Sequence, residues 1–138
     1  MKKIILNKCY GGFDVSDEAY RLYAKRKGLE LFCYKPDFSQ KSMKYIKIDT
    51  ASNIFDFYVT KDLGESTTSK VINDYHLMLE HGHRDDETLI DIVEELGEKA
   101  SGPYGKLVVV EVPDDVAEDY IIDNYDGIET LHKRVQVW

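Results

Sequence analysis

The sequence predicts an α+β fold of two layers, in which two main helices pack on a mixed β-sheet of about six or seven strands. Apolar residues recur at helical spacing in only two segments, and short runs of β-branched and aromatic residues fill much of the remaining chain. The first 35 residues read as strand, helix and strand, which predicts a βαβ unit at the start. With 138 residues the chain is expected to form a single domain over 1–138.

The first strand is expected over residues 1–6 and the first helix after a turn at Gly11-Gly12. Ser16 is suited to the N-cap of this helix because its hydroxyl can accept a hydrogen bond from a free backbone amide. Basic residues fill the last turn, and Gly28 is expected to end the helix.

Four strands are expected in the next part of the chain. The first of them is ended by Pro36, and a polar connection over 61–70 precedes the last, whose letters fit a helical turn nearly as well. The four segments are 29–35, 43–48, 54–60 and 75–79.

A second helix is expected after Asp86, which can cap it, and it ends at Gly97 or Gly102. The next segment, 107–112, is the strongest strand signal, because its run of β-branched residues is typical of a strand buried on both faces.

The last expected element is a β-hairpin. Its strands are 120–125 and 128–138, and the intervening Asp126-Gly127 is a strong signal for a two-residue turn. We therefore expect the chain to end on an antiparallel pair, with Trp138 at its last position.

Charge is distributed unevenly along the chain. Residues 1–50 hold eleven Lys/Arg and six Asp/Glu, whereas residues 51–138 hold seven and twenty. The acidic part would repel phosphate, which argues against binding of long nucleic acid. The basic part leaves room for a small anionic ligand, and the asymmetry allows head-to-tail contacts between copies. A solvated surface with no partner explains the same charges equally well.

Several features favour a cytoplasmic location without a membrane partner. No apolar run approaches the roughly 18 residues of a membrane-spanning helix, and the basic start is followed by too short an apolar run for a signal peptide. Cys9 and Cys33 fit a reducing compartment, where free thiols are the default. Cys9 as a nucleophile is the weaker interpretation, because no sequence signature surrounds it.

The first candidate site is the Gly11-Gly12 turn, where backbone amides can approach a phosphate closely beside a helix start. The turn matches neither a Walker loop nor the dinucleotide-binding fingerprint, and a plain tight turn is the structural alternative. Lys8 would add a charge for phosphate, and Tyr10 and Phe13 would add rings for stacking on a base. We extend this candidate site to Arg84 as a phosphate ligand and Tyr104 as a third ring.

The second candidate is a metal site at His81, His83, Asp85 and Asp86, which resembles the H-x-H-x-D start of metallo-β-lactamase-type hydrolases. Such enzymes need further ligands downstream, and only one later histidine is present. Exposed loop histidines followed by a helix start are the better interpretation. We therefore expect no metal, no cofactor and no catalytic residue.

Three stretches carry a resemblance to a known group of proteins. They are KKIILNKCYGGFDVSDEAYRLYAKRKG, RDDETLIDIVEELGEKASGPYGKLVVVEVPDDV and YDGIETLHKRVQVW. In these stretches the chain resembles small bacteriophage and prophage proteins of Gram-positive bacteria, for which no reaction is established. The resemblance implies a phage protein that acts in the cytoplasm of the bacterial host cell, and by analogy of setting and size an anti-defence role.

Three functions follow as hypotheses. The leading one is a non-enzymatic homo-oligomer that sequesters a small nucleotide immune signal, of the cyclic nucleotide or ADP-ribose type. The second is a metal-dependent hydrolase of such a nucleotide that uses the His81 cluster. The third is an acidic inhibitor that binds a host protein through the C-terminal half.

Overall fold

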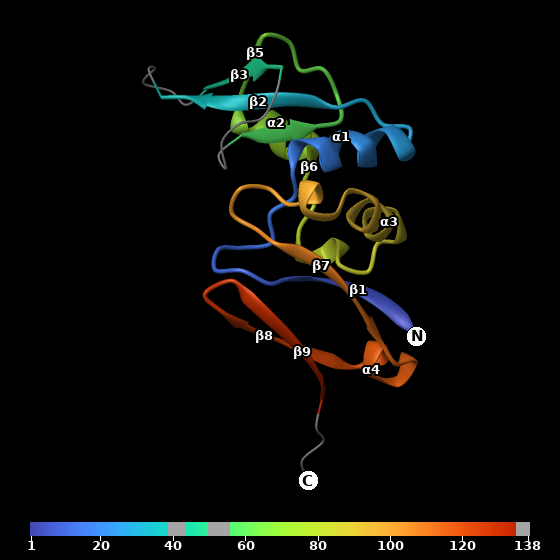
Figure 1. The fold of residues 1–138 in the computed structure, drawn as a ribbon. Helices are drawn as coiled ribbons and strands as arrows, with labels where there is room; N and C mark the ends of the chain where they lie inside the picture. The colour runs from blue at the N-terminus through green and yellow to red at the C-terminus, as the bar shows by residue number, and fades with distance from the viewer. Residues whose placement is uncertain (39–43, 50–55, 135–138) are drawn as a thin grey trace. The chain divides into compact units, whose positions relative to one another are not determined.

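The computed structural model describes residues 1–38, 44–49 and 56–134, and it confirms the α+β class (Figure 1). Contacts divide the chain into two compact units. We call residues 1–23 and 79–138 the terminal unit and residues 24–78 the central unit. The single domain over 1–138 stays a prediction, because contact density does not report on independent folding.

The terminal unit is built on a two-stranded antiparallel sheet of β1 (Lys2–Asn7) and β7 (Leu107–Val112). A hairpin of β8 (Tyr120–Tyr125) and β9 (Ile128–Lys133) forms a second antiparallel pair. The other elements are helical: the 3₁₀ turns η1 (His81–His83) and η2 (Gly97–Ala100), and the helices α3 (Glu87–Leu96) and α4 (Asp114–Glu118).

The sheet of the terminal unit separates two apolar layers. On one side Ile4, Leu6 and Val112 pack against partly buried side chains of α4 and of the hairpin. On the other side α3 contacts both strands and buries its apolar stripe, in which Leu89 and Ile92 are fully buried (Figure 1). Helix, sheet and hairpin therefore form three stacked layers within this unit.

Both main helices begin where the sequence predicted. In α1 (Asp17–Arg26), which runs from the terminal unit into the central unit, the Ser16 hydroxyl accepts from the Ala19 amide at 3.1 Å. In α3 the Asp86 carboxylate accepts from the amides of the first turn, and Gly97 ends the helix with a φ of 59°. These ends are confirmed because capping depends only on neighbouring residues.

The central unit holds a five-stranded antiparallel sheet in the order β5-β3-β2-β4-β6, with one helix, α2 (Ser69–Tyr75). Tyr34, Val59 and Ile72 form its buried core. The strands are β2 (Phe32–Asp37), β3 (Lys44–Ile48), β4 (Phe57–Val59), β5 (Ser66–Thr67) and β6 (His76–Leu77).

The predicted βαβ unit is wrong. β1 pairs with β7, and β2 pairs with β3 and β4 in another sheet, so the two strands around α1 never share a sheet. All described pairs are antiparallel and lie in three separate sheets, which corrects the expectation of one mixed sheet. Strand, helix, strand in a sequence does not reveal pairing, because β1 finds its partner about 100 residues away.

Local corrections concern the central unit. β2 continues through Pro36 to Asp37, and the connection expected over 61–70 contains β5 and the start of α2. Met43, Ile54 and Trp138, where three predicted strands begin or end, lie outside the described residues. Among the residues that are described, no helix is long and apolar enough to cross a membrane.

β7 is formed over the predicted residues but is buried only in part on each face. Leu107 and Val112 at its ends are buried, the three valines between them are half-buried, and Glu111 is exposed. The difference arises because β7 pairs with β1 along one edge only. A run of β-branched residues indicates a strand but not its place in the sheet.

Candidate functional site

Three loops of the terminal unit meet at the Gly11-Gly12 turn. The Gly11 amide donates to the Asp126 carbonyl of the hairpin turn at 2.9 Å, and the Gly12 amide donates to the Tyr104 carbonyl at 3.0 Å. Figure 1 shows the β1–α1 loop and the hairpin turn at the same side of this unit. We call the segments 8–13, 102–106 and 124–127 the joined loops.

Glycine is required at one of the two turn positions. Gly11 has a φ of 145°, and a Cβ there would collide with the Tyr104 carbonyl oxygen. Gly127 in turn lies against the Gly11 backbone. A Cβ at Gly12 would meet nothing within 4 Å. The pair is therefore asymmetric, and Gly11 is the position that the loop contact needs.

The amides of the turn are already used. Both glycine N–H groups donate to backbone carbonyls, so neither points to a free phosphate position. The structural alternative, a tight turn, describes these two residues well. A phosphate contact at the joined loops would have to come from side chains instead.

Asn7 at the end of β1 connects the three loops. Its side chain is fully buried, and its amide nitrogen donates to the carbonyls of Cys9, at 3.0 Å, and of Gly127, at 2.6 Å. Its carbonyl oxygen accepts from the Lys106 amide at 2.7 Å. Sequence reasoning missed this residue, because nothing local distinguishes it from an ordinary polar strand end.

Arg84 and Glu129 form a buried ion pair beside β1. The two guanidinium nitrogens donate to the two carboxylate oxygens at 3.2 and 3.0 Å, and the residues are 8% and 2% exposed. Burial alone would raise the pKa of the Glu129 carboxyl, but hydrogen bonds from Arg84 and from the Asn7 amide hold it below its usual range. Glu129 is therefore a carboxylate at neutral pH.

The ion pair completes the outer edge of β1. The Ile5 amide donates to the Arg84 carbonyl at 2.8 Å, and the Ile5 carbonyl accepts from the Arg84 guanidinium at 3.0 Å. The Asn7 amide donates to the Glu129 carboxylate at 2.8 Å. These strand groups point away from β7, so Arg84 and Glu129 take the place of a neighbouring strand.

This arrangement leaves Arg84 little scope as a phosphate ligand. Its guanidinium is buried and occupied by Glu129 and the Ile5 carbonyl, and it also lies 5.5 Å from the centre of the Phe13 ring. Phe13 in turn packs 5.6 Å from the His81 ring. Two predicted ligand residues thus meet, but in a structural cluster.

Lys8 belongs to the same network. Its ammonium group donates to the Glu129 carbonyl at 2.6 Å. A carbonyl does not neutralise the charge, so Lys8 keeps a positive charge at the joined loops. Lys106 follows Tyr104 by two residues and is exposed.

Three tyrosines stand exposed on the joined loops. The exposed fractions are 70% for Tyr10, 56% for Tyr104 and 72% for Tyr125. Tyr10 and Tyr104 were predicted as stacking residues, whereas Tyr125 was missed although it directly precedes the Asp126-Gly127 turn. Each loop therefore carries one exposed aromatic ring, and hydrogen bonds hold the three backbones together.

The histidine cluster is not arranged as a metal site. The Asp86 carboxylate accepts from the Thr88 amide and from the Tyr23 hydroxyl, and the His83 ring packs edge-on against Tyr23. Within residues 1–38, 44–49 and 56–134, no three potential metal ligands gather. Neither Cys9 nor Cys33 forms a disulfide within the described part of the chain.

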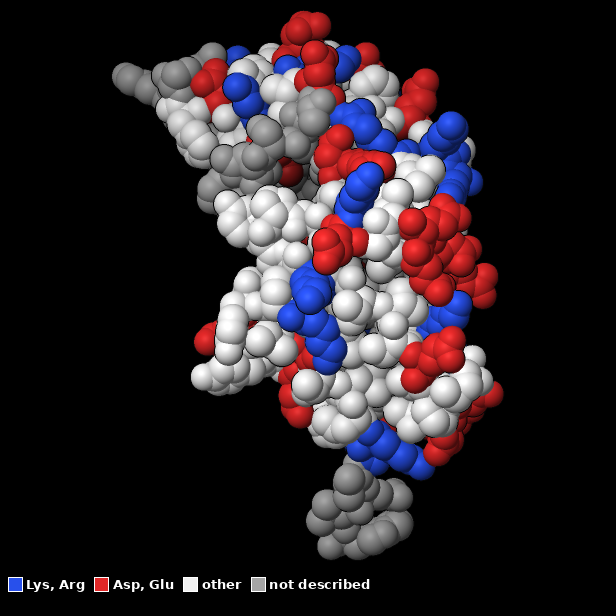
Figure 2. Space-filling view, in the orientation of Figure 1, with Lys and Arg blue, Asp and Glu red and all other residues white. Residues whose placement is uncertain are grey.

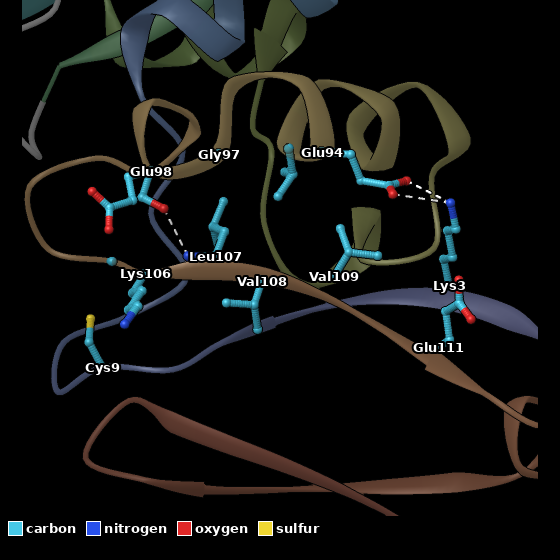
Figure 3. Close-up of a pocket in the computed structure, with 13 residues that line it drawn as sticks. Lys3, Cys9, Glu94, Gly97, Glu98, Lys106, Leu107, Val108, Val109 and Glu111 are labelled. Carbon is cyan, nitrogen blue, oxygen red and sulfur yellow. Dashed lines mark hydrogen bonds and ion pairs between the residues drawn. The ribbon is translucent and has the colours of Figure 1, made fainter.

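A groove of about 770 Å³ lies between β7 and the end of α3 (Figure 3). Its floor includes Leu107, Val108 and Val109, and Figure 3 shows Glu94 and Glu98 above β7. None of the predicted ligand residues lines it. The groove therefore meets the joined loops at Cys9, Gly105 and Lys106 but does not reach the predicted ligand residues.

Comparisons with known proteins do not add to this geometry. No protein-family model, curated protein sequence or solved structure matches the chain.

Proposed function

We propose that the chain is a non-enzymatic binding protein that sequesters a small nucleotide at the joined loops. The observation that supports this proposal is the presence of one exposed tyrosine on each of three hydrogen-bonded loops. Rings in such positions stack on a nucleobase, and loops that are already tied together lose little conformational entropy on binding. The setting remains the one implied by the resemblance, an anti-defence role in the cytoplasm of a bacterial host.

The local charges favour a ligand with few phosphate groups. Lys8 and Lys106 are the cations of the joined loops, whereas Asp126 lies in the hairpin turn and Asp14 accepts from the Tyr104 amide at 3.0 Å. Positive and negative charges therefore nearly balance, so the additional phosphate groups of a polyphosphate would add little to the binding free energy. A cyclic nucleotide or an ADP-ribose-type molecule fits this balance better.

The test is calorimetric titration with ADP-ribose and with cyclic AMP as probes. We expect Tyr10→Ala, Tyr104→Ala and Tyr125→Ala each to weaken binding by about 1–3 kcal/mol for one lost stacking contact. Phe38→Ala is the matched control, because Phe38 is 72% exposed but belongs to the central unit. Lys106→Ala should weaken binding of the nucleotide and leave binding of the corresponding nucleoside unchanged.

Chemistry is tested on the same complex. Because a sequestering protein stores its ligand, heating the complex should return the nucleotide intact, as judged by mass spectrometry. Release of a cleaved product would indicate an enzyme. If the parent chain binds neither probe and carries no nucleotide from infected cells, or if the three tyrosine variants bind like the parent, the proposal is wrong.

A further inference from the structure

The outer edge of β7 offers backbone groups for pairing. Ile5 and Asn7 direct their backbone groups away from β7, and the register opposes them to Val109 and Leu107. In an antiparallel ladder, opposed residues both point inward or both point outward. Leu107, Val109 and Glu111 therefore direct their N–H and C=O groups away from β1.

Within the residues that the structure describes, one end of this edge is covered. The Leu107 amide donates to the Ser101 hydroxyl at 2.8 Å. The amides of Val109 and Glu111 have no hydrogen-bond partner among the residues that the structure describes. They border the groove beside α3, which leaves space along the strand (Figure 3). An edge with half-buried valines and open backbone groups is a template for another strand.

From this edge we infer that two copies of the chain associate by antiparallel pairing of β7 with β7, about a two-fold axis at Val109. This inference does not depend on the proposed nucleotide binding.

The sequence of β7 is self-complementary in this register. Val109 faces Val109 of the second copy, and Val108 faces Val110 of the second copy. Each of these half-buried valines therefore faces another valine. The amides of Val109 and Glu111 then donate to the carbonyls of Val109 and Leu107 of the second copy. The pairing forms about four main-chain hydrogen bonds and closes both edges at once.

The charges at the two ends of β7 favour antiparallel over parallel pairing. Lys106 immediately precedes β7 and Glu111 lies near its end, and both are exposed. Figure 2 shows an uncharged area over the middle of β7, with basic atoms near the start of the strand and acidic atoms near its end. Antiparallel pairing brings unlike ends together, whereas parallel pairing would place Lys106 beside Lys106 of the second copy.

The main test is amide hydrogen exchange measured by NMR at increasing protein concentration, with sedimentation velocity run in parallel. We expect a monomer–dimer equilibrium in which exchange at Val109 and Glu111 slows as the dimer forms. Val108 and Val110 are internal controls, because their amides point toward β1 and should be protected at every concentration.

Charge variants test the direction of pairing. Glu111→Lys should weaken the dimer, since it places a positive charge at the end of β7 that pairing brings toward the Lys106 end of the second copy. The double variant Lys106→Glu with Glu111→Lys should largely restore it, because the ends that pairing brings near each other then carry unlike charges again. Glu118→Lys on α4 makes the same change in net charge away from β7 and should leave the dimer unchanged.

Four results would overturn the inference. One is a monomer at concentrations up to ~1 mM, well above those of typical specific dimers. Another is a dimer whose exchange at Val109 and Glu111 does not depend on concentration. The third is an equal effect of Glu111→Lys and Glu118→Lys. Protection of the two amides only after addition of an alternating Val/Lys peptide would assign the edge to a foreign strand instead.

Discussion

The two outer edges of the β1–β7 sheet differ in how their outward backbone groups are hydrogen-bonded. Along β1, Arg84 and Glu129 are hydrogen-bonded to the outward amide and carbonyl of Ile5 and to the outward amide of Asn7. Along β7, only the Leu107 amide has a partner in the part of the chain that the structure describes. The edge of β1 is thus covered around Ile5 and Asn7 by the Arg84 backbone and the Arg84 and Glu129 side chains, whereas within the described residues the edge of β7 is open beyond Leu107.

The difference shows that a buried ion pair can substitute for a strand. Charged side chains supply donors and acceptors at a sheet edge without adding a flat surface that a further strand could join. The closed edge therefore contributes to the stability of the terminal unit. The open edge can pair with a strand of another molecule, and leaving it unpaired changes the free energy of unfolding of the single chain little.

The largest effect is expected from breaking the closed edge. Arg84→Met removes one partner of a buried pair and leaves the Glu129 carboxylate without its cation. We expect a loss of about 3–5 kcal/mol in the free energy of unfolding, measured by urea denaturation at neutral pH. Lys3→Met is the control, since it breaks an exposed ion pair between Lys3 on β1 and Glu94 on α3.

The double variant Arg84→Met with Glu129→Met tests whether the ion pair stabilises the fold through its hydrogen bonds to the edge of β1. An ordinary buried pair can be replaced by apolar side chains at little cost. Here the replacement also strips the Ile5 carbonyl and the Asn7 amide of partners, so a clear loss of stability should remain. A double variant as stable as the parent would contradict the edge-closing role.

The same pair gives a pH dependence of known sign. The pKa of Glu129 is lowered in the folded chain, so its stabilisation is complete above its usual pKa in the unfolded chain. The stabilisation is lost as the pH falls through the lower, folded value. The acid-induced loss of stability should accordingly be shallower in Glu129→Gln than in the parent.

A smaller effect is expected where the closed edge continues into the joined loops. Gly11→Ala forces a Cβ against the Tyr104 carbonyl at a φ of 145°. We expect it to reduce the free energy of unfolding by about 1–3 kcal/mol, as measured by thermal and urea denaturation. Gly12→Ala is the matched control, because a Cβ at Gly12 meets nothing within 4 Å.

Comparing the stability of the two variants also tests the described contact between the loops. If Gly11→Ala and Gly12→Ala are equally stable, the loop contact contributes nothing to the fold. A Gly12→Ala variant that unfolds earlier than Gly11→Ala would contradict the described geometry of the turn.

How far the sequence could predict the fold depended on the distance between interacting residues. The caps at Ser16 and Asp86 and the hairpin turn at Asp126-Gly127 were predicted correctly, since each depends on a few neighbouring residues. The βαβ unit was predicted wrongly, because β1 and β2 have the right spacing but join different sheets. Periodicity reports which segments are strands and not which strands pair.

The same limit applied to the candidate site. The sequence displays Arg84 as a cation but not its partner Glu129, 45 residues away, so a structural arginine was predicted to bind phosphate. The Gly11-Gly12 backbone and Tyr104 do lie in contact, while their role in binding a ligand stays a prediction. The use of the glycine amides within the fold could be recognised only once the three loops were seen together.

The smallest effect should be found on the open edge, where Val109→Pro removes an amide that bonds nothing among the described residues of the chain. Proline is tolerated in a strand whose N–H faces outward, so the free energy of unfolding of the monomer should change by no more than about 0.5 kcal/mol. Val110→Pro, one position along, removes an amide that points toward β1 and should cost about 1–3 kcal/mol. Urea denaturation at a concentration where the chain is monomeric compares the two, and equal losses would mean that the outward direction of Val109 has been assigned wrongly.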